Sequence, residues 1–129
     1  MVVAATATTV PSPRPTWLTV QGKAFRATAL RHEVGARITA AAAVEEVVTH
    51  NGFWVGTGAA DRVWVELVGP RRSIRIANGD RLRFVGTVTA NPPSYAERAG
   101  LTASTGAAQL TRQGAHIDLP TTAVQVLAP

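Results

Sequence analysis

The stretch at residues 51–67 constrains the fold of this chain more than any other, because it predicts two strands bounded by tight turns. Asn51-Gly52 is the strongest two-residue signal for a β-hairpin, and it predicts a type I′ turn in which both residues have positive φ. Two apolar runs, at residues 53–56 and 63–67, follow this signal and are separated by a turn rich in Gly and Ala. We therefore expect consecutive antiparallel strands with this stretch at their centre.

The alternation of side chains along these strands separates an inner set from an outer set. Trp54 and Trp64 fall on the outer face of neighbouring strands, together with Glu66. The inner set consists of Phe53, Val55, Val63, Val65 and Leu67. The inner set predicts the interior of a barrel, and the two tryptophans are left for another role.

Other segments supply further strands. The run at residues 37–48 alternates like a strand but changes parity near its end, which predicts a bulge or bend near Glu45. A helix is the alternative there, because Ala and Glu favour helices, but the run leads directly into the hairpin signal. Residues 81–88 form another strand, in which Gly86 indicates a bend or a close backbone approach. A short strand at residues 17–20 precedes them all.

Two short helices are expected late in the chain. Ser94 and Glu97 have the spacing of a capping box, with Ser94 as the N-cap, and Gly100 would end that helix. A second helix is predicted at residues 107–113 and would stop at Gly114. Both helices are too short to form a helical domain.

The chain as a whole predicts one domain. Strand-like runs return at residues 116–119 and 124–127. Residues 1–15 are small, polar and interrupted by proline, so we interpret them as a disordered tether. The domain at residues 16–129 is then all-β, a five-stranded barrel with an extra N-terminal strand and one or two short helices.

This succession of strands resembles the OB-fold, with a long bent first strand, a hairpin, a fourth strand with a central glycine and a late closing strand. Four runs are similar to those of small OB-fold domains in exported bacterial proteins of unknown function, of the actinobacterial type: Gly52-Phe53-Trp54-Val55-Gly56, Arg62-Val63-Trp64-Val65, Gly79-Asp80-Arg81-Leu82-Arg83-Phe84-Val85-Gly86-Thr87-Val88 and Gln113-Gly114-Ala115-His116-Ile117. The resemblance covers about residues 35 to 127 and implies an OB-like barrel rather than an activity. The chain departs from the usual OB layout, because the interval at about residues 68–78 is too short and too rich in Gly, Pro and Arg for a helix.

The composition bounds the function only loosely. The 129 residues include 13 Lys or Arg and 8 Asp or Glu, for a formal net charge of +5. A basic balance is typical of proteins that bind nucleic acid or an anionic surface. We favour the other explanation, a GC-rich genome whose codons enrich Arg and Ala. The absence of cysteine excludes disulfides, thiolate metal sites and cysteine nucleophiles.

The beginning of the chain suggests where the protein resides. No apolar run approaches the roughly 18–20 residues of a membrane helix, so we expect no transmembrane segment in this chain. The first residues lack the basic and apolar regions of an intact secretory signal. The Thr-, Ser- and Pro-rich run at residues 8–15 is typical of a tether that follows a cleaved signal or anchor. We therefore expect an extracytoplasmic domain, secreted or tethered, with a cytoplasmic location as the alternative.

The two outward tryptophans are the first candidate ligand site. Trp54 and Trp64 lie on adjacent strands and, with Arg83 predicted nearby, would form a stacking platform. Stacking of a nucleic-acid base on an aromatic ring contributes about 1–3 kcal/mol per base. The alternative is that the strand holding Trp17 or the helix holding Tyr95 covers both rings.

Three arginines form the second candidate. Arg71, Arg72 and Arg75 cluster in the loop between the third and fourth strands of the barrel. They are candidates for binding an anion, a phosphate or a polyanion. The alternative is an ordinary solvated loop.

The patterns for catalysis and metal binding are weak. His116 and Asp118 share one strand face, as two metal ligands would, but no third ligand is identifiable by spacing, so we expect no metal and no cofactor. Glu45 and Glu46 are adjacent in a strand and are predicted to point to opposite faces. No serine has a nucleophile context such as Gly-x-Ser-x-Gly. We therefore expect a protein that is not an enzyme.

Two hypotheses for the function follow. The first is a binding or interaction module of OB-fold type for an unknown protein or envelope component, in which Trp54 and Trp64 are buried under the chain itself or under a partner. The alternative is a domain that binds single-stranded nucleic acid or a polyanion. It requires both tryptophans to be exposed beside Arg71, Arg72 and Arg83 in one groove.

Overall fold

The computed structural model describes residues 17–20, 23–24, 27–69 and 75–127. In chain order its elements are β1 (Trp17–Val20), β2 (Lys23–Ala24), the 3-10 helix η2 (Ala27–Glu33), β3 (Arg37–Val47), β4 (Gly52–Gly58), β5 (Asp61–Val68), β6 (Arg81–Ala90), α1 (Tyr95–Arg98), the 3-10 turn η3 (Ala103–Thr105), α2 (Ala107–Gln113), β7 (Ala115–Pro120), the 3-10 turn η4 (Thr121–Ala123) and β8 (Val124–Leu127). The tether predicted at residues 1–15 lies outside the described residues.

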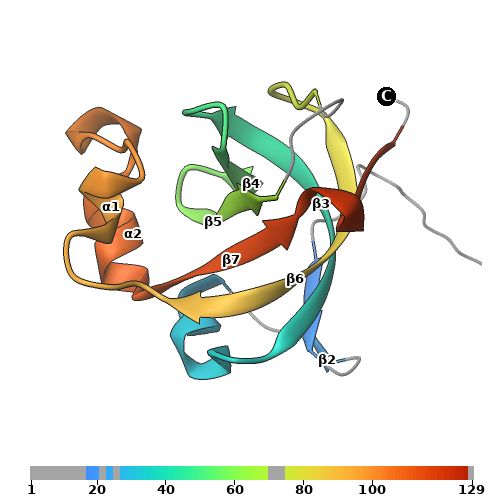
Figure 1. The fold of residues 1–129 in the computed structure, drawn as a ribbon, viewed down its shortest axis with the longest axis horizontal. Coiled ribbons are helices and arrows are strands. Elements are labelled where there is room, and N and C mark those ends of the chain that lie inside the picture. The colour runs from blue at the N-terminus through green and yellow to red at the C-terminus, as the bar shows by residue number, and fades with distance from the viewer. Residues whose placement is uncertain (1–16, 21–22, 25–26, 70–74, 128–129) are drawn as a thin grey trace, which may run out of the picture.

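Five strands close into a barrel in the order β3-β4-β5-β7-β6, and β6 pairs with β3 to complete the ring (Figure 1). The pairings within the ring are antiparallel except for β5 with β7, which run parallel. The predicted all-β, five-stranded OB-like barrel is therefore confirmed, and so are its extra N-terminal strand and its short helices.

Elements outside the ring protect its edges and one end. β1 pairs with residues 38–41 of β3, beside the part of β3 that pairs with β4. β8 pairs with residues 81–84 of β6. The short helix η2 packs against β5, β6 and β7, and its Leu30 is fully buried in the barrel interior. Figure 1 shows η2 closing the lower end of the barrel.

The long strand β3 bends where the sequence predicts it. Val44 pairs with Val55 of β4, whereas Glu46 pairs with Trp54, so one extra residue is inserted at Glu45. This bulge lets β3 pair with β6 along its first half and with β4 along its second half. The helix considered for this run is wrong, because pairing on both edges of β3 overrides the helix propensity of its alanines.

The interior of the barrel contains the predicted inner residues. The buried cluster that fills it includes Phe53, Val55, Val63, Val65 and Leu67 from β4 and β5, and Leu82, Phe84 and Val88 from β6. Gly86 lies on the same inner face of β6, and a Cβ atom there would lie 2.5 Å from Cγ2 of Ile117. The close backbone approach predicted at Gly86 is therefore confirmed.

The hairpin between β3 and β4 forms without the predicted turn. Neither Asn51 nor Gly52 has a positive φ, so the type I′ prediction is wrong. The backbone N–H groups of Val48 and Thr49 both donate to the carbonyl oxygen of Gly52, which already belongs to β4. Gly52 is needed for space instead, because a Cβ atom there would lie 2.2 Å from Cζ2 of Trp64.

Both predicted helices are present, and one detail of their termini is wrong. α1 begins after Ser94, but Ser94 has a left-handed backbone (φ 63°) and its side chain makes no capping hydrogen bond, so the capping box is not formed. Gly100 follows α1 and Gly114 ends α2, both with positive φ, as expected. In the part of the chain that the structure describes, no helix is long and apolar enough to span a membrane.

The packing at Gly52 gives a first prediction. Gly52→Ala keeps an accessible backbone conformation but forces a methyl group against the Trp64 ring, and overpacking of this kind costs about 1–3 kcal/mol. Urea denaturation should show this loss in the free energy of unfolding. Gly58→Ala is the matched control, since nothing lies within 4 Å of a Cβ atom there and its φ is not in the left-handed region. A loss as large in Gly58→Ala as in Gly52→Ala would contradict this explanation.

Candidate functional site

Trp54 and Trp64 form the centre of a second hydrophobic core on the outer face of β4 and β5. They are paired across the two strands, and their rings meet edge to face with centroids 5.3 Å apart and an interplanar angle of 71°. Both side chains are 0% exposed. Their outward orientation is confirmed, because they belong to a cluster separate from that of the barrel interior.

The segment between β6 and β7, residues 91–114, covers this face. Leu101 and Leu110 from this segment are buried against the two rings, and Trp54 Nε1 donates to the carbonyl oxygen of Thr105 at 2.9 Å. Figure 1 shows α1 and α2 side by side beside β4 and β5, outside the barrel. An exposed stacking platform is therefore not formed, and the alternative, in which the helix holding Tyr95 covers the rings, holds.

Arg62 fastens this covering segment to the barrel. Its guanidinium lies 4.2 Å from the ring centroid of Trp54, and its Nε donates to Gln109 of α2 at 2.9 Å. Its Nη1 contacts Oε1 of Glu45 at 2.6 Å and Oε1 of Glu46 at 3.4 Å. Both carboxylates thus reach one cation, and their predicted placement on opposite faces is wrong because the bulge at Glu45 changes the alternation.

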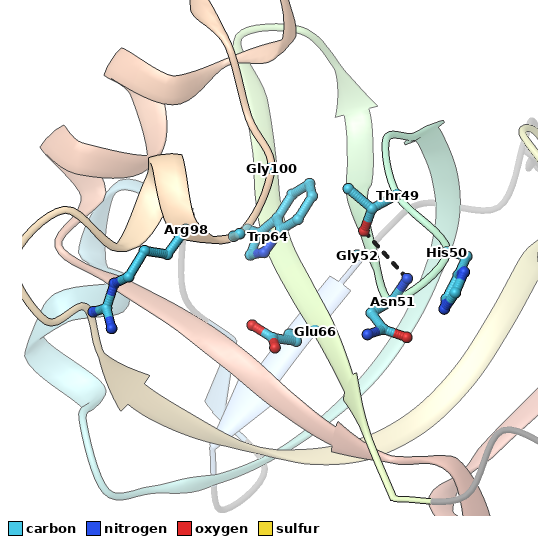
Figure 2. Close-up of a pocket in the computed structure, with 9 residues that line it drawn as sticks. Thr49, His50, Asn51, Gly52, Trp64, Glu66, Arg98 and Gly100 are labelled. Atoms are coloured by element: carbon cyan, nitrogen blue, oxygen red, sulfur yellow. Dashed lines mark hydrogen bonds between the residues drawn. The ribbon is translucent and has the colours of Figure 1, made fainter.

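A hollow of about 350 Å³ remains at one margin of the covered face, and we call it the Trp64 hollow. It is lined by residues 49–52 of the β3–β4 loop, by Trp64 and Glu66 of β5, and by residues 98–100 at the end of α1. Figure 2 shows Trp64 and Glu66 in the middle of this site, with His50 at one margin and Arg98 at the other. Three separate segments therefore contribute polar groups to one space.

The loop side of the Trp64 hollow is held by its own hydrogen bonds. The backbone N–H of Asn51 donates to Thr49 Oγ1 at 3.2 Å (Figure 2). The carbonyl oxygen of Asn51 in turn accepts from the N–H of Leu67 at 2.7 Å. The loop is thus fixed to β5, and its side chains lie on a preformed margin.

A hydrogen-bonded network lies behind Glu66. The hydroxyl of Tyr95 donates to Oε1 of Glu66, and the Tyr95 ring stacks on His116 with centroids 4.1 Å apart. His116 Nδ1 lies 2.7 Å from Oδ1 of Asn91, and its Nε2 lies 3.0 Å from Oδ1 of Asp118. Glu66 is therefore oriented by groups on three other segments of the chain.

Burial sets the protonation of two groups in this network. Desolvation, and then the neighbouring Glu66 carboxylate, raise the pKa of Tyr95 far above its usual value, so its phenol keeps the proton that it donates. Desolvation lowers the pKa of His116, and the charge of Asp118 opposes this shift only in part. Both contacts of the His116 ring are acceptors, which would suit a charged ring, but burial outweighs them and favours the neutral form.

His116 and Asp118 are thus occupied within the fold. Both ring nitrogens of His116 already have partners, and Asp118 also accepts from Thr89 Oγ1 at 3.0 Å. Among the described residues, no three His, Asp or Glu side chains gather as a metal site would require. The geometry assigns the pair to the support of Tyr95 and Glu66.

The predicted arginines do not converge on the tryptophans. Arg71 and Arg72 lie outside the described residues, and Arg75 lines a different, smaller hollow beside Ile76. Arg83 pairs with Ala41 of β3, whereas Trp54 pairs with Glu46 of the same strand. Five residues of strand separate these two positions, roughly 16 Å. The prediction that Arg83 lies near the tryptophans is therefore wrong.

Sequence patterns did not identify several residues of the site. Arg98, Thr49 and Tyr95 come from a loop and a one-turn helix, and no motif links them to β5. Glu66 was placed correctly on the outer face, and its position beside Trp64 was the available signal. The network could be found only once the packing of α1 on the barrel was known.

Comparisons of this chain with protein-family models, with curated proteins and with solved structures found no match. The functional conclusion therefore depends on the geometry of the Trp64 hollow and its surroundings.

The buried His116 predicts how stability depends on pH. Because the fold favours the neutral ring, the unfolded chain binds the proton more readily, so the free energy of unfolding should fall as the pH decreases below about 6.5. One proton limits the slope to about 1.4 kcal/mol per pH unit. Chemical denaturation between neutral and mildly acidic pH measures it.

His116→Gln should flatten this dependence, and His32→Gln, at an exposed position of η2, should retain it. A wild-type protein that becomes more stable on acidification, with the gain lost in His116→Gln, would contradict the assignment. It would show that Asn91 and Asp118 hold the ring in its charged form.

Proposed function

We propose that this protein is a non-enzymatic binding module of OB-fold type, and that its ligand site is the Trp64 hollow. The observation that carries the proposal is the meeting of the β3–β4 loop, the outer face of β5 and the β6–β7 segment around one preformed space. OB barrels bind oligosaccharides and oligonucleotides with these parts, namely the face of strands two and three and the loops that follow strands one and four. In this chain they correspond to β4, β5, residues 48–51 and residues 91–114.

The chemistry of the hollow supports a neutral, hydroxyl-rich ligand such as a short oligosaccharide. Glu66 supplies a carboxylate that accepts hydrogen bonds from hydroxyl groups, and Arg98 supplies donors on the other side. The carboxylate is held in place by Tyr95, so it loses little freedom when a ligand binds. The hollow also contains apolar surface from Trp64 and Gly52, which suits the C–H face of a sugar ring.

The structure gives less support to single-stranded nucleic acid or another polyanion. Trp54 and Trp64 are buried, so neither ring face is open to a base. Glu66 lies in the middle of the remaining hollow and would repel a phosphate backbone. Arg83, the described arginine that was expected beside the rings, lies elsewhere on the barrel.

A titration followed by NMR tests the proposal. Uniformly ¹⁵N-labelled protein is titrated with cellotetraose and chitotetraose, and with single-stranded DNA at low and high salt. The expected result is a saturable shift of the Gly52 and Gly100 amide signals with an oligosaccharide, and no saturable shift with DNA. Glu66→Gln should weaken binding by about tenfold, since hydrogen bonds to a charged group contribute about 1.5–3 kcal/mol.

Glu97→Gln is the matched control, because Glu97 is exposed on α1 and does not line the Trp64 hollow. It should bind as the wild type does. Shifts that saturate with DNA and weaken steeply with salt would replace the proposal with the polyanion hypothesis. Shifts with neither probe would overturn the proposed ligand class.

A further inference from the structure

A second hollow, which we call the arginine hollow, lies between η2, the β4–β5 turn and α2. Its volume is about 300 Å³. It is lined by Thr28 and Arg31 of η2, by Ala60 of the turn, and by Gln109, Arg112 and Gln113 of α2. None of these residues lines the Trp64 hollow. Three segments that are far apart in the sequence thus surround a space large enough for a small ligand.

The arginine hollow carries positive charge that the fold does not neutralise. Arg31 and Arg112 are exposed, and neither forms an ion pair or hydrogen bond with any residue that the structure describes. No carboxylate is among the residues that line it. The nearby Arg62 differs, because Glu45 and Glu46 balance its charge. Two guanidinium groups at one hollow favour an oxyanion, which accepts their N–H donors in pairs.

Gln113 adds a buried acceptor to the arginine hollow. Its side chain is only 8% exposed, and its Nε2 donates to the carbonyl oxygen of Arg62 at 2.7 Å. This bond fixes the amide, because the reversed orientation would place two oxygens together. Its Oε1 is buried and has no hydrogen-bond partner within the fold. A buried acceptor left unsatisfied costs about 1–3 kcal/mol, so a donor that reaches Oε1 would be bound favourably.

We propose that the arginine hollow binds a phosphate group that retains a proton, as inorganic phosphate or as a phosphate monoester. The phosphate oxygens would accept from Arg31 and Arg112, and the P–OH group would donate to Gln113 Oε1. A sulfate or an ionised carboxylate offers the same acceptors but no proton near neutral pH. The combination of two free cations with one buried acceptor therefore distinguishes phosphate from other anions. This site does not depend on what the Trp64 hollow binds.

The test compares phosphate with sulfate at constant ionic strength and near-neutral pH. ¹⁵N-labelled protein is titrated with each salt, and the side-chain NH₂ signal of Gln113 and the backbone amides of α2 are followed. We expect saturable shifts with a Kd of about 1 mM or tighter for phosphate, and binding of sulfate at least about tenfold weaker. The amides of residues 49–52 should not move, which separates this result from the test of the Trp64 hollow.

Variants assign the binding to the two arginines. Arg31→Gln and Arg112→Gln should each weaken phosphate binding by about tenfold, with unchanged thermal stability as the check on folding. Arg83→Gln, at an exposed position of β6, should leave it unchanged. Equal affinity for phosphate and sulfate would mean an adventitious ion only and would overturn the proposal. So would the absence of saturable shifts, or shifts that Arg31→Gln and Arg112→Gln leave intact.

Discussion

The burial of Trp54 and Trp64 on the outer face of the barrel is the constraint on which the rest of this structure depends. Each tryptophan can bury about 150–250 Å², so covering the pair is worth up to roughly 8–12 kcal/mol at 25 cal/mol per Å². The barrel interior cannot supply that cover, because both rings point away from it. The β6–β7 segment provides it with Leu101 and Leu110. Gly106 permits the approach, since a Cβ atom there would lie 2.7 Å from the Trp54 ring.

This cover decides what kind of binding surface the protein offers. An OB-like barrel with an open face could stack extended ligands across β4 and β5. Here α1, η3 and α2 occupy most of that face, and the space that remains is the Trp64 hollow at the β3–β4 loop. A hollow of this size suits a few sugar units rather than a long polymer, and it underlies the proposed function. The same segment also forms one wall of the arginine hollow, through α2.

Local pattern predicted most of the barrel and little of the site. Alternation placed Phe53 inward and Trp64 outward, because period-two burial depends only on neighbouring residues. The bulge near Glu45 was also predicted, since a change of parity is visible in the sequence. The turn at Asn51-Gly52 was predicted wrongly, because Gly52 is required by contact with a ring twelve residues away. The network around Glu66 was missed for the same kind of reason, as its members meet only through tertiary packing.

Hydrogen exchange of the indole N–H groups tests the central claim most directly. Trp54 Nε1–H is bonded to Thr105 and fully covered, and Trp64 Nε1–H is buried beneath the same segment. Both protons should exchange only through opening of the β6–β7 segment or of the whole domain, and so far more slowly than an indole in water. Exchange of both at the rate of a solvent-exposed indole would contradict the account, because it would mean that the tryptophan face is open.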